Sequence, residues 1–212
     1  MFEQEREHLV FHLCRQGYIK TDAVKQAFLT VPRDIFVPES LQNYSYVDTP
    51  LDIGHGQTIS APHMVAIMCE ALDIKKGQKI LEIGTGSGYH AAIVAQLVGA
   101  AGRVYTIERF DVLTAQAKQN LTTMHCRNVI VEVGDGSCGL PAYQPYDCIY
   151  VTCAAPSIPE PLIHQLGDPG KLLIPLGDMY CELTLLRKEH HQQTRQHLGG
   201  CVFVPLVGRY GH

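Results

Sequence analysis

The sequence predicts an α/β fold in which a doubly wound, mostly parallel sheet is followed by a C-terminal antiparallel hairpin. Two observations support this prediction. Between residues 79 and 177, short apolar runs alternate with helical segments, which is the order of elements in βαβ units. Three glycines, Gly84, Gly86 and Gly88, stand at alternate positions between an apolar run and a helical segment. A glycine turn of this kind lets a polar ligand approach the backbone at the carboxyl end of a parallel sheet.

The N-terminal part of the chain is predicted to be helical and then irregular. Apolar residues at near-helical spacing predict a helix over 2–16 that Gly17 closes, and Thr21 is the expected N-cap of a second helix over 22–30. Prolines then end that helix. The stretch 39–59 has no clear period, and we expect an irregular segment with short strands that lies over the glycine turn.

The later elements follow in the order of a doubly wound sheet. Ser60, Ala61 and Pro62 are expected to start a helix that runs to about Leu72, because proline is tolerated in a first turn. Strands and helices then alternate: strands are expected over 80–83, 103–108, 128–133, 147–152 and 170–176, and helices over 89–98, 112–121 and 159–166. The final hairpin is expected to have strands over 181–188 and 200–207, joined by a His-rich polar loop over 187–197. A metal site in that loop is the alternative; we expect none.

Composition and charge exclude several classes of protein. The chain has 212 residues, 46% hydrophobic and 18% charged, which suits one packed domain or a domain with an appendage. A net charge of −4 without a basic block implies no nucleic-acid partner. No apolar run approaches the roughly 20 residues of a membrane helix, and the acidic, polar N-terminus is unlike a signal peptide. Eight cysteines without a C-x-x-C pair are expected to be reduced thiols in a cytoplasmic protein.

The spacing of the glycines selects among ligands. In the dinucleotide fingerprint G-x-G-x-x-G, the third glycine would stand where this chain has Tyr89. The acid Glu82 precedes Gly84 by two residues. The resulting E-x-G-x-G-x-G pattern resembles the cofactor motif of class I S-adenosylmethionine-dependent methyltransferases. The alternative is an ordinary βαβ turn next to an unrelated acid.

Two further strand ends carry candidate ligand-binding residues. Glu108 ends a predicted strand, 24 residues after Gly84, where a carboxylate is expected to accept two hydrogen bonds from ribose hydroxyls. Asp135 and Gly136 follow the next predicted strand directly. Asp135 is expected to accept a hydrogen bond from an adenine amino group, and Gly136 to let the backbone come close. The alternative there is a plain Asp-Gly turn.

The stretch from Asp48 to Met64 carries the most specific signal. It resembles the D-x-P-L-x-I-G-x-G-x-T-I-S-x-P signature of the protein-L-isoaspartate O-methyltransferase family. Val31-Pro32-Arg33 with Phe36-Val37-Pro38, and much of the C-terminal half, are similar to the same family. Two parts depart from its pattern: Asp168-Pro169-Gly170-Lys171 stands in place of a Pro-Gly-Gly-Arg-like turn, and 178–200 matches weakly.

The resemblance implies a Rossmann-like methyltransferase sheet and S-adenosylmethionine as methyl donor, with no metal. It implies methyl transfer to the free α-carboxylate of L-isoaspartyl residues in damaged proteins and peptides, which starts their repair through a succinimide. We expect a cytoplasmic monomer with no nucleic-acid or membrane partner. A single domain over 1–212 is expected, with a substrate-side segment over 1–59, a cofactor-binding core over 60–177 and the hairpin over 178–212. Ser60 is the implied catalytic residue, and the expected cofactor-binding residues are Thr58, Ile59, Ser60, Glu82, Gly84, Thr85, Gly86, Gly88, Glu108, Asp135 and Gly136.

Some of these residues have a second interpretation. A serine before Ala-Pro and a helix is also an expected N-cap, so Ser60 could be a cap, an orienting group, or both. His63 could approach the substrate or simply face solvent in the first turn of that helix. Asp48 and Asp52 are expected to anchor the loop through hydrogen bonds rather than to take part in the reaction.

The expected reaction needs no strong general base. A peptide α-carboxylate has a pKa of about 3.3–3.7 and is already ionised at neutral pH, so the site has only to position and desolvate it. The first rival function is a class I methyltransferase acting on a small carboxylic acid or another nucleophile. The second is a cofactor-binding adaptor without catalysis, against which the intact Ser60 and glycine turn count.

Overall fold

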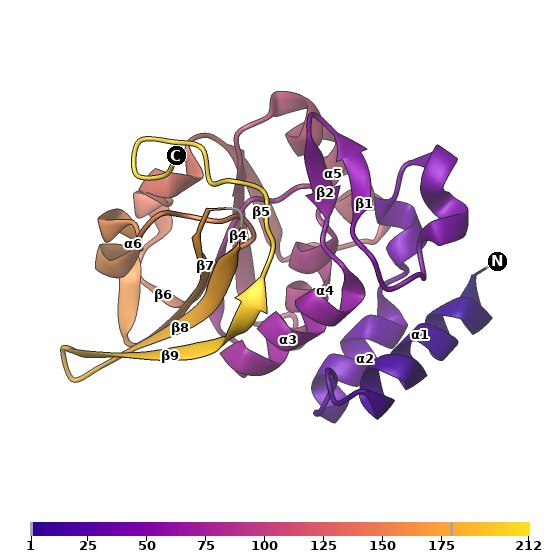
Figure 1. Ribbon diagram of the computed structural model, residues 1–212, viewed down its shortest axis with the longest axis horizontal. Helices are drawn as coiled ribbons and strands as arrows, with labels where there is room; N and C mark the ends of the chain where they lie inside the picture. The colour runs from indigo at the N-terminus through magenta and orange to yellow at the C-terminus, as the bar shows by residue number, and fades with distance from the viewer. Residues whose placement is uncertain (1, 179) are drawn as a thin grey trace.

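The computed structural model describes residues 2–178 and 180–212. Within these ranges the chain forms a seven-stranded sheet in the order β5-β4-β3-β6-β7-β8-β9 (Figure 1). Neighbouring strands from β5 to β7 pair in parallel, whereas β7, β8 and β9 pair antiparallel. The strands are β3 (Lys79–Ile83), β4 (Arg103–Glu108), β5 (Val129–Val133), β6 (Tyr146–Val151), β7 (Leu166–Gly177), β8 (Cys181–Glu189) and β9 (Gln192–Cys201). The doubly wound, mostly parallel sheet with an antiparallel C-terminal hairpin is therefore confirmed.

Residues on opposite faces of the parallel strands enter two separate hydrophobic cores. On β3, Ile80 belongs to the core that also contains side chains of the N-terminal helices, while Leu81 and Ile83 belong to the other. Both faces are apolar because helices and turns cover each of them, as expected for a parallel sheet. The covering helices are α3 (Pro62–Leu72), α4 (Tyr89–Val98), α5 (Asp111–Thr123) and α6 (Glu160–Gln165). Strand β3 lies between β4 and β6, so the strand order reverses its direction at β3. In doubly wound sheets, ligands bind at the carboxyl ends of the strands beside such a point.

The N-terminal segment folds as its sequence predicts. Helix α1 spans Glu3–Arg15 and α2 spans Asp22–Thr30. The Thr21 hydroxyl accepts a hydrogen bond from the Val24 N–H at 3.3 Å, which is the predicted N-cap. Two 3₁₀ turns follow, η1 (Arg33–Phe36) and η2 (Glu39–Tyr44), and then a small antiparallel pair of strands, β1 (Leu51–Gly54) and β2 (Gln57–Ile59). None of the helices in the described part of the chain has the length and apolar character needed to cross a bilayer.

The C-terminal hairpin differs from its prediction in the second strand. The strand expected over 200–207 instead runs over Gln192–Cys201, so most of the expected His-rich loop is strand. The turn is only His190 and His191, both with positive φ (51° and 63°). Asp168 holds this turn because its two carboxylate oxygens accept hydrogen bonds from both histidine N–H groups, at 2.8 and 2.7 Å. Among the described residues, no cluster of His, Cys, Asp and Glu is arranged to hold a metal ion.

The apolar run Val202–Leu206, which reads as a strand, crosses the end of the sheet instead. It pairs with Ala154, which follows β6: the Ala154 N–H donates to the Val204 carbonyl at 2.8 Å, and the Leu206 N–H donates to the Ala154 carbonyl at 2.7 Å. The segment is thereby brought to the carboxyl end of the parallel strands.

Candidate active site

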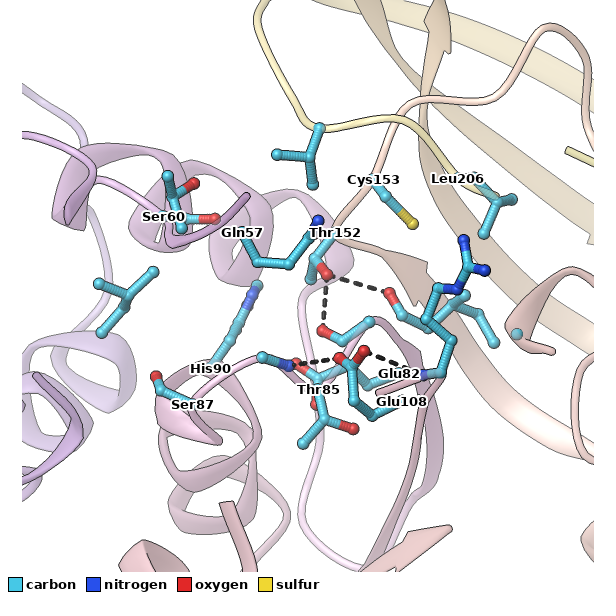
Figure 2. A pocket seen from close by; sticks show the side chains of 18 of the residues that line it. Gln57, Ser60, Glu82, Thr85, Ser87, His90, Glu108, Thr152, Cys153 and Leu206 are labelled. Carbon is cyan, nitrogen blue, oxygen red and sulfur yellow. Dashed lines mark hydrogen bonds between the residues drawn. The ribbon is translucent and has the colours of Figure 1, made fainter. Parts of the chain in front are cut away.

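A cavity opens at the carboxyl ends of β3, β4 and β6 (Figure 2). Four parts of the chain line it: the end of β2 with Ser60, the glycine turn, the end of β4, and the C-terminal segment over 204–207. Its walls also include Val65, Glu82, Ile83, Tyr89, His90, Gly136, Thr152 and Cys153.

Gly84 is required where the glycine turn leaves β3. Its φ is +92°, and a Cβ atom there would lie 2.4 Å from Thr152 Oγ1. The Thr152 hydroxyl occupies this place because it lies 3.0 Å from the Ile83 carbonyl and 2.7 Å from the Gly84 carbonyl, donating toward both. The tip of β6 thus holds the glycine turn in place. Gly88, in contrast, is not among the residues that line the cavity: it is the N-cap of α4 with φ +89°, and a Cβ there would lie 3.3 Å from Leu121 of α5.

The carboxylate of Glu108 holds two parts of the cavity wall together. Its Oε2 accepts a hydrogen bond from the Gly86 N–H at 2.9 Å, and its Oε1 accepts from the N–H groups of Arg109 and Phe110 at 2.9 and 3.1 Å. A carboxylate has about four acceptor positions, so one position remains for a ligand. The sequence led us to expect two bonds to a ribose; in this arrangement the backbone already takes three positions.

Glu82 forms the base of the cavity wall and is completely buried. Its Oε2 lies 2.5 Å from Thr106 Oγ1, and its Oε1 accepts from the Tyr150 hydroxyl at 2.9 Å. Thr106 Oγ1 is in turn 2.6 Å from Thr85 Oγ1, and Thr85 lines the cavity. Burial raises the pKa of Glu82 to about 8, although both hydroxyls favour the charged form.

His90 lies in the first turn of α4 beside this network. Its ring packs on Tyr150 with the centroids 4.4 Å apart, and its Nε2 is 3.5 Å from the Cys69 sulfur. Burial lowers the pKa of His90 to about 3, so the imidazole is uncharged at neutral pH. The buried position of His90 could not be predicted from the sequence, because a histidine after a glycine turn is equally compatible with a surface position.

Ser60 lines the cavity on the side opposite Cys153 and Leu206 (Figure 2). The expectation that Ser60 caps α3 is wrong. The N-cap position is Ala61, which makes no side-chain bond, and the His63 N–H instead donates to Asp48 Oδ1 at 2.9 Å. None of the described residues makes a hydrogen bond to the Ser60 hydroxyl in this structure. The hydroxyl is thus available to a ligand.

The loop acids have the anchoring roles that the sequence suggests. Asp48 Oδ1 also lies 2.9 Å from His63 Nδ1, and the His63 ring packs on Tyr18 outside the cavity. Asp52 Oδ1 accepts from the Gly54 N–H at 2.6 Å. The β1–β2 pair reaches over the glycine turn, where Ile53 Cδ1 would lie 3.3 Å from a Cβ on Gly86.

Arg33 attaches the N-terminal segment to the cavity wall. It is fully buried, and its guanidinium lies over the Tyr89 ring at 5.0 Å and donates to the Thr49 carbonyl at 3.3 Å. Burial lowers the pKa of Arg33 to about 10, which leaves the group charged at neutral pH. A cation on an aromatic face is a favourable arrangement when both are desolvated. The residue therefore links Tyr89, on the cavity wall, to the loop that precedes β1.

The two residues that follow β5 have different surroundings. Gly136 lines the cavity, whereas Asp135 does not. Asp135 Oδ1 accepts from the Ser137 N–H and hydroxyl at 2.9 and 2.7 Å, and its Oδ2 accepts from the Arg209 N–H at 2.8 Å. In this conformation Asp135 anchors the C-terminal loop, and its carboxylate is occupied.

Gly136→Ala is expected to destabilise the protein by about 1–3 kcal/mol, the usual cost of overpacking. A Cβ at this position would lie 2.5 Å from Ile83 Cγ2, in the second core directly under the cavity. Denaturant unfolding measures the change. Gly200→Ala is the matched control, because nothing lies within 4 Å of its Cβ position and its φ is not positive. Equal stabilities of the two variants would show that the loop at Gly136 adapts without strain.

The sequence did not predict two contributions to the cavity. Thr152 and Cys153 could have been suspected because they follow a parallel strand, where ligand sites collect. The segment over 204–207 carries no local signal: its position depends on the pairing with Ala154, which lies about 50 residues earlier.

The cavity suits a ligand that combines positive charge, hydroxyl groups and an apolar ring. Glu108 offers a free acceptor position in the cavity wall, the glycine turn offers close backbone approach, and Ile107 and Phe110 offer apolar contact. His90 is uncharged and Cys153 is a buried thiol whose pKa is raised by burial, so neither is activated as a base or nucleophile. Such a site can bind, orient and exclude water; it is poorly suited to proton abstraction.

Comparison with known proteins agrees with this geometry. Residues 4–211 match the family model described as protein-L-isoaspartate(D-aspartate) O-methyltransferase. A protein-L-isoaspartate O-methyltransferase of Methanopyrus kandleri is 53% identical over 100% of this chain and 95% of its own, and one of Methanococcus aeolicus is 50% identical over 98% and 96%.

Solved structures show the same similarity. A protein-L-isoaspartate O-methyltransferase superposes with a TM-score of 0.89 at 32% identity, covering 97% of this chain and 67% of its own. A Plasmodium falciparum relative, solved in complex with S-adenosyl-L-homocysteine, superposes with a TM-score of 0.86 at 28% identity over 95% and 98% of the two chains.

Proposed function

The chain belongs to the protein-L-isoaspartate(D-aspartate) O-methyltransferase family, and we propose that the cavity at the ends of β3, β4 and β6 is its active site. The enzyme transfers a methyl group from S-adenosylmethionine to the free α-carboxylate of L-isoaspartyl residues in damaged proteins and peptides. The methyl ester can then close to a succinimide, whose hydrolysis returns part of the damaged residue to normal aspartate.

The donor supplies an electrophilic methyl group on a positively charged sulfur. On the protein side, Glu108 is proposed to accept a ribose hydroxyl with its remaining acceptor position, while Thr58, Ile59 and the glycine turn form the adjoining wall. The backbone at Gly136 and the side chains of Ile107 and Phe110 are available to contact the adenine ring of the donor. Asp135 could accept a hydrogen bond from the adenine amino group only if its hydrogen bonds from Ser137 and Arg209 broke. In this conformation we propose that Asp135 holds the loop that lies beside the adenine ring.

Ser60 is proposed to hold the substrate carboxylate. Its hydroxyl has no partner among the described residues and stands at the cavity wall, which is the observation that carries the proposal. Donation to one carboxylate oxygen would leave the other free to meet the methyl group. A neutral hydroxyl suits this task, because a stronger, cationic donor would withdraw more charge from the nucleophile.

The isoaspartyl linkage is proposed to be recognised through the backbone of the substrate. Isoaspartyl and aspartyl peptides have equal charge, so bulk electrostatics do not distinguish them. They differ by one methylene moved from side chain to backbone, which shifts the carboxylate relative to the flanking peptide groups. The β1–β2 pair and the segment from Val202 to Pro205 offer backbone groups that can pair with an extended peptide. Such pairing ignores side chains, so we expect broad sequence tolerance.

Rapid methylation of an isoaspartyl peptide, and little of its aspartyl twin, is the expected result. The two peptides have the same sequence and differ only in the linkage, and transfer of a labelled methyl group is the measurement. Comparable methylation of both would contradict recognition of the linkage. Rapid methylation of a small free acid with neither peptide modified would favour the rival methyltransferase function, and donor binding without any turnover would favour an adaptor.

The remaining proposals concern the chain as a whole. We propose that residues 1–212 act as one domain, in which 1–59 serves the substrate, 60–177 binds the donor and 178–212 completes the site. We further propose that the enzyme works as a cytoplasmic monomer without a nucleic-acid or membrane partner; the net charge of −4 supports the absence of a nucleic-acid partner.

A further inference from the structure

A negative charge on the buried Glu82 would not be balanced by a cation among the described residues. Its carboxyl group is fully buried, and its two hydrogen-bond partners, Thr106 and Tyr150, are uncharged hydroxyl groups. Within residues 2–178 and 180–212, no lysine, arginine or histidine forms an ion pair with it. An isolated buried carboxylate is costly, and such a group usually stays protonated instead.

The titratable groups around Glu82 add no positive charge. On α3, burial holds the pKa of the Cys69 thiol well above its usual value, so this group stays protonated and neutral. On β6, burial likewise holds the pKa of Tyr150 well above its usual range. On α4, His90 is uncharged at neutral pH. On β4, Glu108 accepts three backbone N–H bonds, which suits a negative charge and so opposes a second one nearby.

A chain of hydroxyl groups connects Glu82 to Thr85, another residue of the cavity wall, and fits either protonation state. The chain runs from Glu82 through Thr106 to Thr85, with oxygen–oxygen distances of 2.5 and 2.6 Å. If Glu82 is charged, Thr106 donates to it and accepts from Thr85. If Glu82 is protonated, it donates to Thr106, which donates to Thr85, so Thr85 can turn its own hydrogen toward the cavity. A proton can thus be taken up or released without breaking the chain.

We propose that Glu82 is a protonated acid in the free enzyme and that binding of the positively charged methyl donor drives its ionisation. This inference rests on the proposed function. The step is balanced: the carboxylic acid becomes a carboxylate, and its proton passes to the buffer. The donor carries a sulfonium, an ammonium and a carboxylate group, whereas the demethylated product keeps the ammonium and the carboxylate but has lost the sulfonium charge. Glu82 therefore favours the donor over the product, and this preference grows as the pH rises toward the point where free Glu82 ionises.

Calorimetric titration of the intact protein tests this directly. The donor and the product, S-adenosylhomocysteine, are each titrated at one pH in phosphate and in Tris, which differ in heat of ionisation. The difference in observed binding enthalpy between the two buffers gives the number of protons released. At pH 7, a free-state pKa of about 8 predicts release of up to about 0.9 proton on donor binding, and distinctly less on product binding. Work at or below pH about 7 keeps the α-amino group of both ligands, with a pKa of about 7.7–8.0 for a model α-amine, mostly protonated.

Two variants show whether Glu82 is the group that releases the proton when the donor binds. Glu82→Gln is expected to abolish the difference in proton release between donor and product. Glu132→Gln is the matched control: this carboxylate is on β5, outside the cavity, and accepts from the Tyr143 hydroxyl at 2.9 Å, so proton release should be unchanged. If Glu82→Gln does not fold, the comparison of donor with product in the unaltered protein still decides the matter.

The ligand-free protein gives a second readout. A pKa raised in the folded state means that Glu82 binds more proton in the folded protein than in the unfolded one between pH about 4.5 and about 8. The contribution of Glu82 to stability therefore falls as the pH rises through this window, whereas Glu82→Gln lacks this loss. The melting temperature of the variant minus that of the unaltered protein should increase from the acid to the alkaline end of the window.

The outcomes separate the two proposals. Donor binding without proton release, or equal release by donor and product, would overturn this inference and leave the proposed function standing. Failure of the donor to bind at all would overturn the proposed function and this inference with it.

Discussion

Glu108→Ala is expected to weaken donor binding by between about tenfold and a few hundredfold. One charge-assisted hydrogen bond is worth about 1.5–3 kcal/mol, and the acceptor position left on Oε2 would make such a bond to a ribose hydroxyl. The variant also releases the N–H groups of Gly86, Arg109 and Phe110, which Glu108 now holds in place. We therefore expect a further loss from disorder of the glycine turn, together with a stability loss of about 1–3 kcal/mol.

Titration calorimetry with the demethylated product measures the loss of affinity, and denaturant unfolding measures the loss of stability. Glu108→Gln is the matched variant. It keeps the size of the side chain and one acceptor oxygen, but its amide NH₂ must face a backbone donor, so an intermediate affinity is expected. Unchanged affinity in Glu108→Ala, with only the stability lowered, would mean that Glu108 shapes the loop and does not bind the ribose.

The glycine turn and its strand could be predicted because their signals are local. Three alternate glycines, an apolar run before them and a helical segment after them all lie within about ten residues. Each glycine proved to have positive φ, a conformation that L side chains rarely adopt. The same argument extends along the parallel half of the sheet, where each strand is an apolar run covered on both faces.

The C-terminal hairpin could not be predicted because its turn depends on a distant residue. His190 and His191 both adopt positive φ, which favours glycine or asparagine, and Asp168 holds both of their N–H groups. The residues near the turn do not indicate that Asp168 holds it. Strand β9 is a polar edge strand, while the apolar run after it lies across the sheet end. Apolar periodicity therefore favoured the wrong segment.

Site roles were less predictable than site positions. The sequence placed Ser60, Glu82 and Glu108 near one another, and the structure brings all three to one cavity. It did not reveal what occupies their polar atoms, because hydrogen bonds to backbone groups leave no pattern in the sequence. Asp48 supplies the N–H acceptor that Ser60 was expected to provide, from 15 residues before His63.

Ser60→Ala is expected to reduce turnover by roughly 10–100-fold with little change in stability. A hydrogen bond from a neutral hydroxyl to a charged carboxylate is worth about 1.5–3 kcal/mol, and this bond acts on the nucleophile while it reacts. Stability should change by no more than about 0.5 kcal/mol. The reason is structural: Ser60 is not the N-cap of α3, and its hydroxyl has no bond to any described residue. Binding of the donor should be nearly unchanged.

Steady-state kinetics on an isoaspartyl peptide separates the turnover number from the Michaelis constants, and thermal unfolding measures stability. Ser60→Thr retains the hydroxyl and should recover part of the lost turnover. Ser157→Ala, an exposed serine outside the cavity, should behave like the unaltered enzyme in both measurements. A Ser60→Ala variant that melts several degrees lower yet turns over normally would show that the hydroxyl supports the start of α3 after all. The isoaspartyl carboxylate would then have to be held by backbone groups alone, from the β1–β2 pair and the segment over 202–205.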